Sequence, residues 1–268
     1  MIPSLLGFCI AVVIGIVAAI IGLGGGFLYV PTLMLVFGLD PRTAVGTSLA
    51  VTVCAAAAAS LRYRQQKKIL NRTAVIMFVP SMVISAFGAL ITQYIDARVM
   101  VLLFALALVL IALQMFFPAL PIVKKMAWGP SYTVNVAERN GDDIRVRVPY
   151  LHLLTWGALG GLVTGTTGIS GGVVFVPALI AIGIPVHFAV ATSLFVIVAA
   201  SFSGAVTHAA LGNISLPFVV VFGTGAAVGA YAGAYIAPGV RADHIRKFFG
   251  IMLVFIALLV IRQKAWLF

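Results

Sequence analysis

The sequence predicts an all-α integral membrane protein with two homologous halves and a small β-hairpin in the segment that joins them. Hydropathy, charge clustering and an internal repeat predict this fold. Of the 268 residues, 63% are hydrophobic and 9% charged, and the mean hydropathy is +1.19. Because soluble domains carry about 25% charged residues, this composition excludes an ordinary soluble globular protein. We expect a multi-pass protein of the cell inner membrane, with the lipid bilayer as its surroundings.

Charged residues mark the boundaries of the expected membrane spans. All 17 basic and 6 acidic residues fall in short clusters, and a helix needs about 20 apolar residues to cross the hydrocarbon core. The net charge of +11 comes from basic residues beside apolar stretches, a pattern typical of membrane proteins, so we expect no nucleic-acid partner. The charge-free stretches are residues 1–39, 43–61, 73–95, 99–123 and 148–240.

An internal repeat relates the two ends of the chain. Residues 22–31 align with residues 168–177, and both contain a Gly-rich string followed by an apolar segment that ends in Val-Pro. Residues 44–49 read Ala-Val-Gly-Thr-Ser-Leu and align with residues 189–194, which read Ala-Val-Ala-Thr-Ser-Leu. These anchors keep their order, so we expect two halves of similar structure, as in many secondary transporters.

Each half is expected to contain five helical segments in the same order. A first span is followed by a Gly-rich break, a short apolar segment and three longer spans. The short segments cannot cleanly cross about 30 Å of hydrocarbon, so each is either a re-entrant loop or half of a discontinuous helix. The expected segments are residues 4–21, 27–38, 43–61, 72–92 and 99–117, then 151–167, 173–183, 188–209, 216–236 and 245–261.

The placement of basic residues favours inverted repeats of five segments each. The 62–72 loop and the 118–149 connector each carry five basic residues, so both are expected on the cytoplasmic side. The second-half equivalent of the first loop, residues 210–215, carries none, whereas the 237–247 turn carries three. This exchange favours inversion, with both termini outside. Two basic residues near the C-terminus favour the alternative, a parallel repeat of four spans.

The connector contains a hairpin pattern. Residues 131–149 alternate apolar and polar positions on both sides of Asn140-Gly141, a dipeptide typical of two-residue turns. We expect a cytoplasmic β-hairpin between an N-terminal transmembrane repeat at residues 1–117 and a C-terminal one at 150–268. Its role is open between a tether for the two halves and a docking edge for a partner.

The sequence resembles the sulfite exporter TauE/SafE family, also described as sulfonate uptake permeases. The resemblance covers nearly the whole chain and rests on residues 15–31 with their glycine run, on residues 44–49 with their Thr-Ser pair, and on the second-half copies. Ser170 replaces one glycine in the second copy, and the 131–149 hairpin is an insertion outside the family pattern. The resemblance implies transport of small sulfur-containing anions such as sulfite and sulfonates.

The Gly-rich breaks are the candidate substrate site. Glycine lets a helix unwind, which leaves backbone N–H groups unpaired at the start of the next segment. Such a helix start has a partial positive charge and binds anions without a charged side chain. The Thr-Ser pairs would add hydroxyl donors. The predicted substrate-binding residues are Gly24, Gly25, Gly26, Thr47, Ser48, Ser170, Gly171, Gly172, Thr192 and Ser193.

Helix packing is the alternative role for small residues, because they let membrane helices approach closely. We assign that role to residues 55–60 and to Gly225, Gly229 and Gly233. The breaks differ, because an interruption inside the membrane leaves polar backbone that must line water or a ligand.

Few titratable side chains fall inside the spans. His187 takes the place of Arg42 in the repeat and His208 that of Tyr63, and we consider His187, His208 and Arg42 as proton relays or anion contacts. His152 falls at a predicted span end, where we expect it to be solvated. No Asp or Glu lies inside a predicted span, so coupled protons would need a histidine, a turn aspartate or the substrate itself.

No enzymatic activity, cofactor or metal site is predicted. Catalysis would need a nucleophile with a base, or metal ligands at reachable spacing, and the spans offer only scattered Ser, Thr and isolated His. We predict a secondary carrier or exporter of a small anion that works by alternating access around the paired breaks. An anion channel through the same breaks is the alternative, and no oligomer is indicated.

Overall fold

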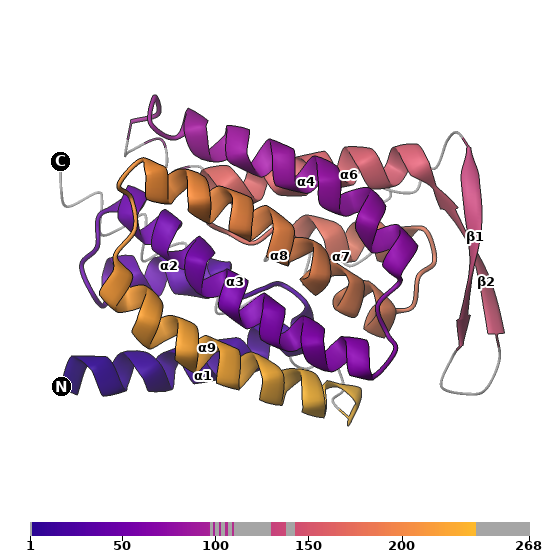
Figure 1. Cartoon of the computed structure of the whole chain (residues 1–268), viewed down its shortest axis with the longest axis horizontal. Coiled ribbons are helices and arrows are strands. Elements are labelled where there is room, and N and C mark those ends of the chain that lie inside the picture. Colours follow the sequence, from indigo (N-terminus) through magenta and orange to yellow (C-terminus); the bar gives the residue numbers. More distant parts are fainter. Residues whose placement is uncertain are drawn as a thin grey trace.

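The computed structural model describes residues 2–96, 130–137 and 143–239, with a few single residues between 99 and 109. In these ranges the chain forms a bundle of roughly aligned helices with a β-hairpin at one end (Figure 1). The first-half helices are α1 (Ile2–Ile21), α2 (Gly26–Leu35), α3 (Pro41–Gln65) and α4 (Asn71–Ile91). After strands β1 (Ser131–Ala137) and β2 (Asp143–Pro149) come α6 (Tyr150–Thr167), α7 (Gly172–Ala181), α8 (Val186–Ala210), α9 (Leu216–Ile236) and the short η2 (Ala237–Gly239).

The predicted helical membrane architecture is confirmed for the described residues. Among them, α3, α4, α8 and α9 together with η2 are long and apolar enough to cross a membrane. The predicted short segments are α2 and α7, each ten residues long. The predicted spans 99–117 and 245–261 lie outside the fully described ranges.

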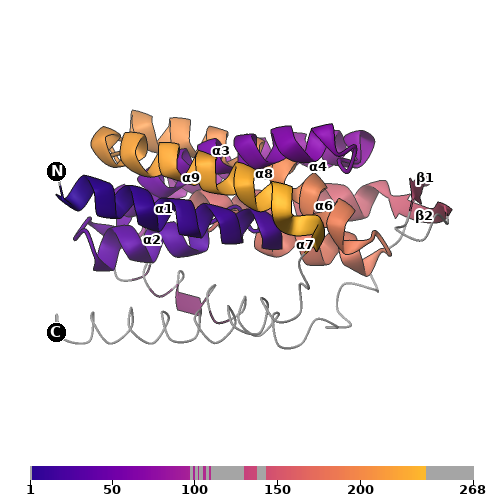
Figure 2. The same ribbon diagram turned by 90° about the horizontal axis from the view of Figure 1, so that it is seen from below.

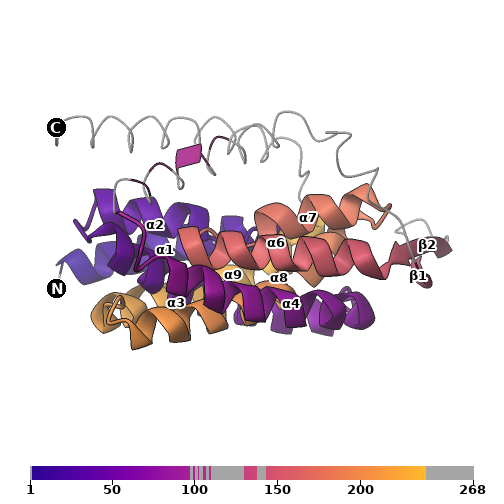
Figure 3. The ribbon, with the colours of Figure 1, turned by 90° about the horizontal axis from the view of Figure 1, so that it is seen from above.

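The main helix contacts join one half to the other, and each contact occurs twice, with equivalent helices of the two halves exchanged. α1 packs on α9, and its equivalent α6 packs on α4, the equivalent of α9. In the same way α3 packs on α9 and α8 on α4, while α3 and α8 pack on each other. The pair α1–α2 occupies one end of the bundle and the pair α6–α7 the other (Figures 2 and 3). Each half thus completes the other, while inversion of the repeat across the membrane stays a prediction.

Glycines bring the outer helix pairs into backbone contact. A Cβ atom on Gly229 of α9 would lie 2.0 Å from the carbonyl oxygen of Val12 on α1, and Gly225 and Gly233 meet α1 in the same way. In the other half, a Cβ atom on Gly165 of α6 would lie 2.0 Å from a carbonyl oxygen of α4. The predicted packing role of the α9 glycines is therefore confirmed.

The predicted hairpin forms in the connector. β1 and β2 pair antiparallel, and one face of the hairpin is buried. The turn predicted at Asn140-Gly141 lies outside the described residues. The apolar pairs in register are Tyr132 with Val148, Val134 with Val146, and Val136 with Ile144.

Tyr132 attaches the hairpin to the helix bundle. Its hydroxyl lies 2.8 Å from Thr73 Oγ1 in α4, and its ring centroid lies 5.1 Å from that of Tyr150, the first residue of α6. The guanidinium carbon of Arg72 lies 4.4 Å from the Tyr132 ring centroid. Burial raises the pKa of Tyr132, while its hydrogen bond with Thr73 and the charge of Arg72 lower it. The hairpin therefore joins the first turns of helices from both halves.

The two basic segments lie at the same end of the bundle. The predicted 62–72 loop consists of the last turn of α3, the connection 66–70 and the start of α4, and it lies at the end that carries the hairpin (Figure 1). The exposed basic residues there include Arg64, Lys67, Arg72, Arg145 and Arg147. The arrangement agrees with the expectation that both segments face one side of the membrane.

Candidate functional site

The first Gly-rich break is residues 22–25, between α1 and α2, and the second is residues 168–171, between α6 and α7. The two breaks meet in the middle of the bundle. A Cβ atom on Gly26 would lie 2.3 Å from the carbonyl oxygen of Gly168, and one on Gly24 would lie 2.3 Å from Ser170 Oγ. Every residue of both breaks is buried. Glycine is required at such contacts because any side chain would overlap the facing backbone. The structure thus brings the predicted glycines of the two halves together, while their binding of a substrate stays a prediction.

Two serines bind the break of the opposite half. Ser48 Oγ donates to the carbonyl oxygen of Gly168 at 3.3 Å, and Ser193 Oγ donates to that of Gly22 at 3.1 Å. The serines occupy equivalent positions in the repeat, as do the two glycines, so the same bond forms twice. Gly22 and Gly168 follow the ends of α1 and α6 with φ of +83° and +69°, the left-handed conformation common after a helix end.

The neighbouring threonines point elsewhere. Thr47 Oγ1 accepts from the backbone N–H of Ser215 at 3.0 Å, and Thr192 Oγ1 accepts from that of Leu70 at 3.1 Å. Ser215 and Leu70 are the residues that precede α9 and α4. The threonine hydroxyls are therefore bonded to the starts of these helices, whereas the serine hydroxyls lie at the breaks.

Tyr63 and His208 form a third equivalent pair. Tyr63 donates its hydroxyl hydrogen to the carbonyl oxygen of Ala19 at 3.0 Å, and His208 Nε2 lies 3.2 Å from that of Gly165. Because a carbonyl oxygen only accepts, this contact assigns the hydrogen to Nε2. His208 is fully buried, and its Nδ1 has no hydrogen-bond partner among the described residues.

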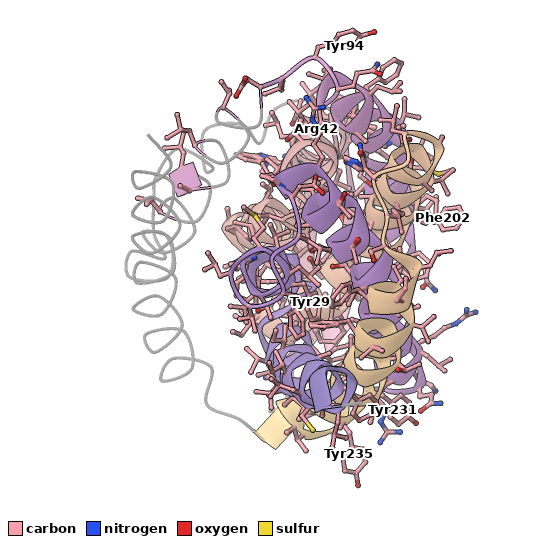
Figure 4. All side chains as sticks on the ribbon, turned by 90° about the vertical axis from the view of Figure 1, so that its left-hand side faces the viewer. Tyr29, Arg42, Tyr94, Phe202, Tyr231 and Tyr235 are labelled. Carbon is pink, nitrogen blue, oxygen red and sulfur yellow. The ribbon has the colours of Figure 1, made fainter. Side chains whose placement is uncertain are left out.

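The other two candidate titratable residues lie away from the breaks. Arg42 Nη2 donates to the carbonyl oxygen of Ile95 at 2.9 Å, just after α4. Figure 4 shows Arg42 apart from the central Tyr29. His187 is exposed in the first turn of α8. The structure thus brings His208 into the interior and leaves Arg42 and His187 near helix ends.

The expectation that His152 is solvated is wrong. Its side chain is only 1% exposed, and its Nε2 lies 2.9 Å from the carbonyl oxygen of Ala178 on α7. The short helix α7 runs back beside the first turn of α6 and covers this histidine. Sequence position alone could not predict this burial, because it depends on the path of the chain after the break.

In the second break, two side-chain hydroxyls accept hydrogen bonds from nearby backbone N–H groups. Thr167 Oγ1 accepts from the N–H of Ile169 at 3.1 Å, and Ser170 Oγ accepts from the N–H of Gly172 at 3.4 Å. The corresponding positions in the first break are isoleucine and glycine, which have no side-chain acceptor. The side-chain bonds of the second break therefore have no counterpart in the first.

The first break has open backbone donors. Gly24 and Gly25 adopt φ of +74° and +87°, so the chain turns sharply before α2 begins. Within the described part of the chain, the N–H groups of Gly24, Gly25, Gly26 and Phe27 have no acceptor, and of their four counterparts in the second break only that of Gly172 has one. Buried N–H groups are almost always paired, so this cluster is the arrangement expected of an anion site.

Sequence reasoning missed Tyr29. Its side chain is fully buried against the first break, and its hydroxyl has no partner among the described residues. The available signal was a tyrosine within an apolar segment, aligned with Phe175 in the repeat. Only the fold reveals that its ring lies over Gly25.

Comparison with known proteins agrees with this architecture. The family model described as sulfite exporter TauE/SafE matches residues 7–260. Probable membrane transporter protein YunE of Bacillus subtilis (strain 168) is 30% identical over 274 residues, covering 94% of this chain and 96% of the relative. Probable membrane transporter protein MJ0441 of Methanocaldococcus jannaschii is 26% identical over 249 residues, covering 87% and 86%. No solved structure matches. With a family match over nearly its whole length, the chain belongs to the sulfite exporter TauE/SafE family of membrane transporters.

Proposed function

We propose that this protein is a secondary transporter of a small sulfur-containing anion, such as sulfite or a sulfonate, in the cell inner membrane. The observation that carries the proposal is the cluster of buried, unpaired N–H groups in the first break, where that break meets the second. The family description supplies the substrate class. By the positive-inside rule we place the hairpin end in the cytoplasm. The positions of the pairs α1–α2 and α6–α7 at opposite ends of the bundle support an inverted repeat (Figures 2 and 3).

The site would bind its anion with neutral donors. The open N–H groups stand at the start of α2, where the helix dipole adds a partial positive charge. In the described part of the chain, Lys and Arg lie in loops, in the hairpin and near helix ends. The N–H groups at a helix start can bind an anion without a buried cationic side chain.

Alternating access follows from the way the two broken pairs meet. The pairs α1–α2 and α6–α7 extend from opposite ends of the bundle toward its middle (Figures 2 and 3). Ser48 and Ser193 bind each break to a long helix of the other half. A tilt of one pair relative to the other would open the bound anion to one side at a time. If protons are coupled, His208 is the buried titratable candidate.

The test is transport by purified protein in lipid vesicles, with labelled sulfite and methanesulfonate. We expect saturable uptake and counterflow, whereas single-channel currents would support a channel. Gly25→Ala should abolish uptake, because a Cβ atom there would lie 2.6 Å from Tyr29 Cε2 and the φ of +87° disfavours alanine.

Gly38→Ala is the matched control. Gly38 has φ of +70°, but a Cβ atom there meets nothing within 4 Å, so this variant imposes the backbone strain without disturbing a break. It should transport like the parent. Stabilisation of the parent protein by sulfite, measured by thermal unfolding, tests binding even if Gly25→Ala does not fold. Equal uptake by Gly25→Ala and the parent would refute the proposed site.

A further inference from the structure

The phenol hydroxyl of Tyr29 is an unpaired polar group in the interior. Tyr29 lies one turn into α2, its side chain is 0% exposed, and its hydroxyl has no partner in the described part of the chain. Figure 4 shows Tyr29 inside the bundle, whereas Tyr94, Tyr231 and Tyr235 point outward. A buried tyrosine hydroxyl normally has a hydrogen-bond partner, so its position calls for a ligand.

The ring of Tyr29 carries this hydroxyl to the first break. A Cβ atom on Gly25 would lie 2.6 Å from Tyr29 Cε2 and 3.1 Å from Cζ, the atom that bears the hydroxyl. Long side chains in a helix point back toward its N-terminus, which here is the break. The phenol group is therefore close to the open N–H groups of Gly24, Gly25, Gly26 and Phe27.

Phe175 shows that packing does not require the hydroxyl. It occupies the equivalent position in α7, and a Cβ atom on Gly171 would lie 2.7 Å from its Cζ atom. Both halves thus place an aromatic ring over the glycine that precedes the short helix. Only the first half adds a hydroxyl to this ring.

Thr52 adds a second unpaired hydroxyl. Its side chain is 0% exposed, and its Oγ1 has no partner among the residues described. The equivalent residue in α8 is Ile197, whose side chain lies 3.1 Å and 2.9 Å from Cβ atoms built on Gly24 and Gly172. Ile197 therefore lies beside both breaks. Because Thr52 is its equivalent in the repeat, we expect Thr52 to lie beside the breaks as well.

We infer that Tyr29 donates a hydrogen bond to the anion at the first break, with Thr52 as a further donor. This inference rests on the proposed function. Sulfite and sulfonates each present three oxygens, so one anion can accept from backbone N–H groups and from hydroxyls at the same time. Hydrogen bonds to a charged acceptor are the strong ones, so the phenol should contribute much of the affinity.

Tyr29→Phe tests this inference, with Tyr63→Phe as the matched control. Both changes remove a buried phenol hydroxyl, but that of Tyr63 is bonded to Ala19 within the protein. We would measure the Kd for sulfite and methanesulfonate by calorimetry, and thermal unfolding without anion. Tyr29→Phe should weaken anion binding about tenfold or more while leaving the unfolding temperature unchanged or higher. Tyr63→Phe should lower the unfolding temperature and leave the Kd unchanged.

The outcomes separate this inference from the proposed function. If the parent protein binds neither anion, both are wrong. If the parent binds and Tyr29→Phe binds equally well, the role of Tyr29 is refuted and the proposed function stands. Thr52→Val provides a second variant, for which we expect a smaller loss of affinity. Unchanged affinity in Thr52→Val would remove Thr52 from the site.

Discussion

The break after α1 and the break after α6 occupy equivalent places, yet their backbones are satisfied differently. Thr167 and Ser170 supply hydroxyl acceptors in the second break, where the first has isoleucine and glycine. Among the described residues, the Tyr29 phenol of the first break has no partner, and the second break has Phe175 in its place. These substitutions fall at the breaks, whereas the bonds that join the halves are the same on both sides. The repeat therefore supplies a common scaffold, in which a few side chains make the two breaks chemically different.

The largest effect on this comparison should come from the serines that bind the breaks. Ser193→Ala and Ser48→Ala each leave a buried carbonyl oxygen without its donor, which costs about 1–3 kcal/mol. The loss of stability should be similar, and chemical denaturation would measure it. Transport should fall further in Ser193→Ala, because its partner Gly22 belongs to the break at which we place the anion. Equal transport by the two variants would argue that both breaks bind the anion.

A smaller effect on transport is expected from a substitution that makes Tyr63 and its equivalent His208 identical. His208→Tyr introduces the residue that the first half has, and its hydroxyl can donate to the carbonyl oxygen of Gly165 as Tyr63 does to that of Ala19. The fold should persist. If His208 carries a coupled proton, the variant should lose the pH dependence of transport that titration of this histidine causes. An unaltered pH profile in vesicles would exclude that role.

The smallest effect is expected from making the second break like the first. Ser170→Gly removes a long bond of 3.4 Å to the N–H of Gly172, so we expect a loss of about 0.5–1.5 kcal/mol in stability. Anion affinity should not change, and calorimetry with sulfite would measure it. Loss of affinity comparable to that in Tyr29→Phe would place the anion between both breaks.

Local patterns made much of the fold predictable. The charge-free stretches predicted the helices, the alternation around Asn140-Gly141 predicted the hairpin, and the duplicated glycines predicted the breaks. The pairing of α1 with α9 and of α6 with α4 was not predictable, because it joins segments far apart in the chain. The burial of His152 and the unpaired hydroxyl of Tyr29 were missed for the same reason, since each depends on a neighbour across the interior.

The glycine contacts between outer helices bear on which parts can move. α9 lies against the backbone of α1, and α6 against that of α4, so neither pair can slide without losing close contact along its length. The rigid bodies of the transport cycle would then be mixed, each built from helices of both copies. The boundary between them would cut across the ancestral duplication, so that neither copy could fold or function as a unit alone.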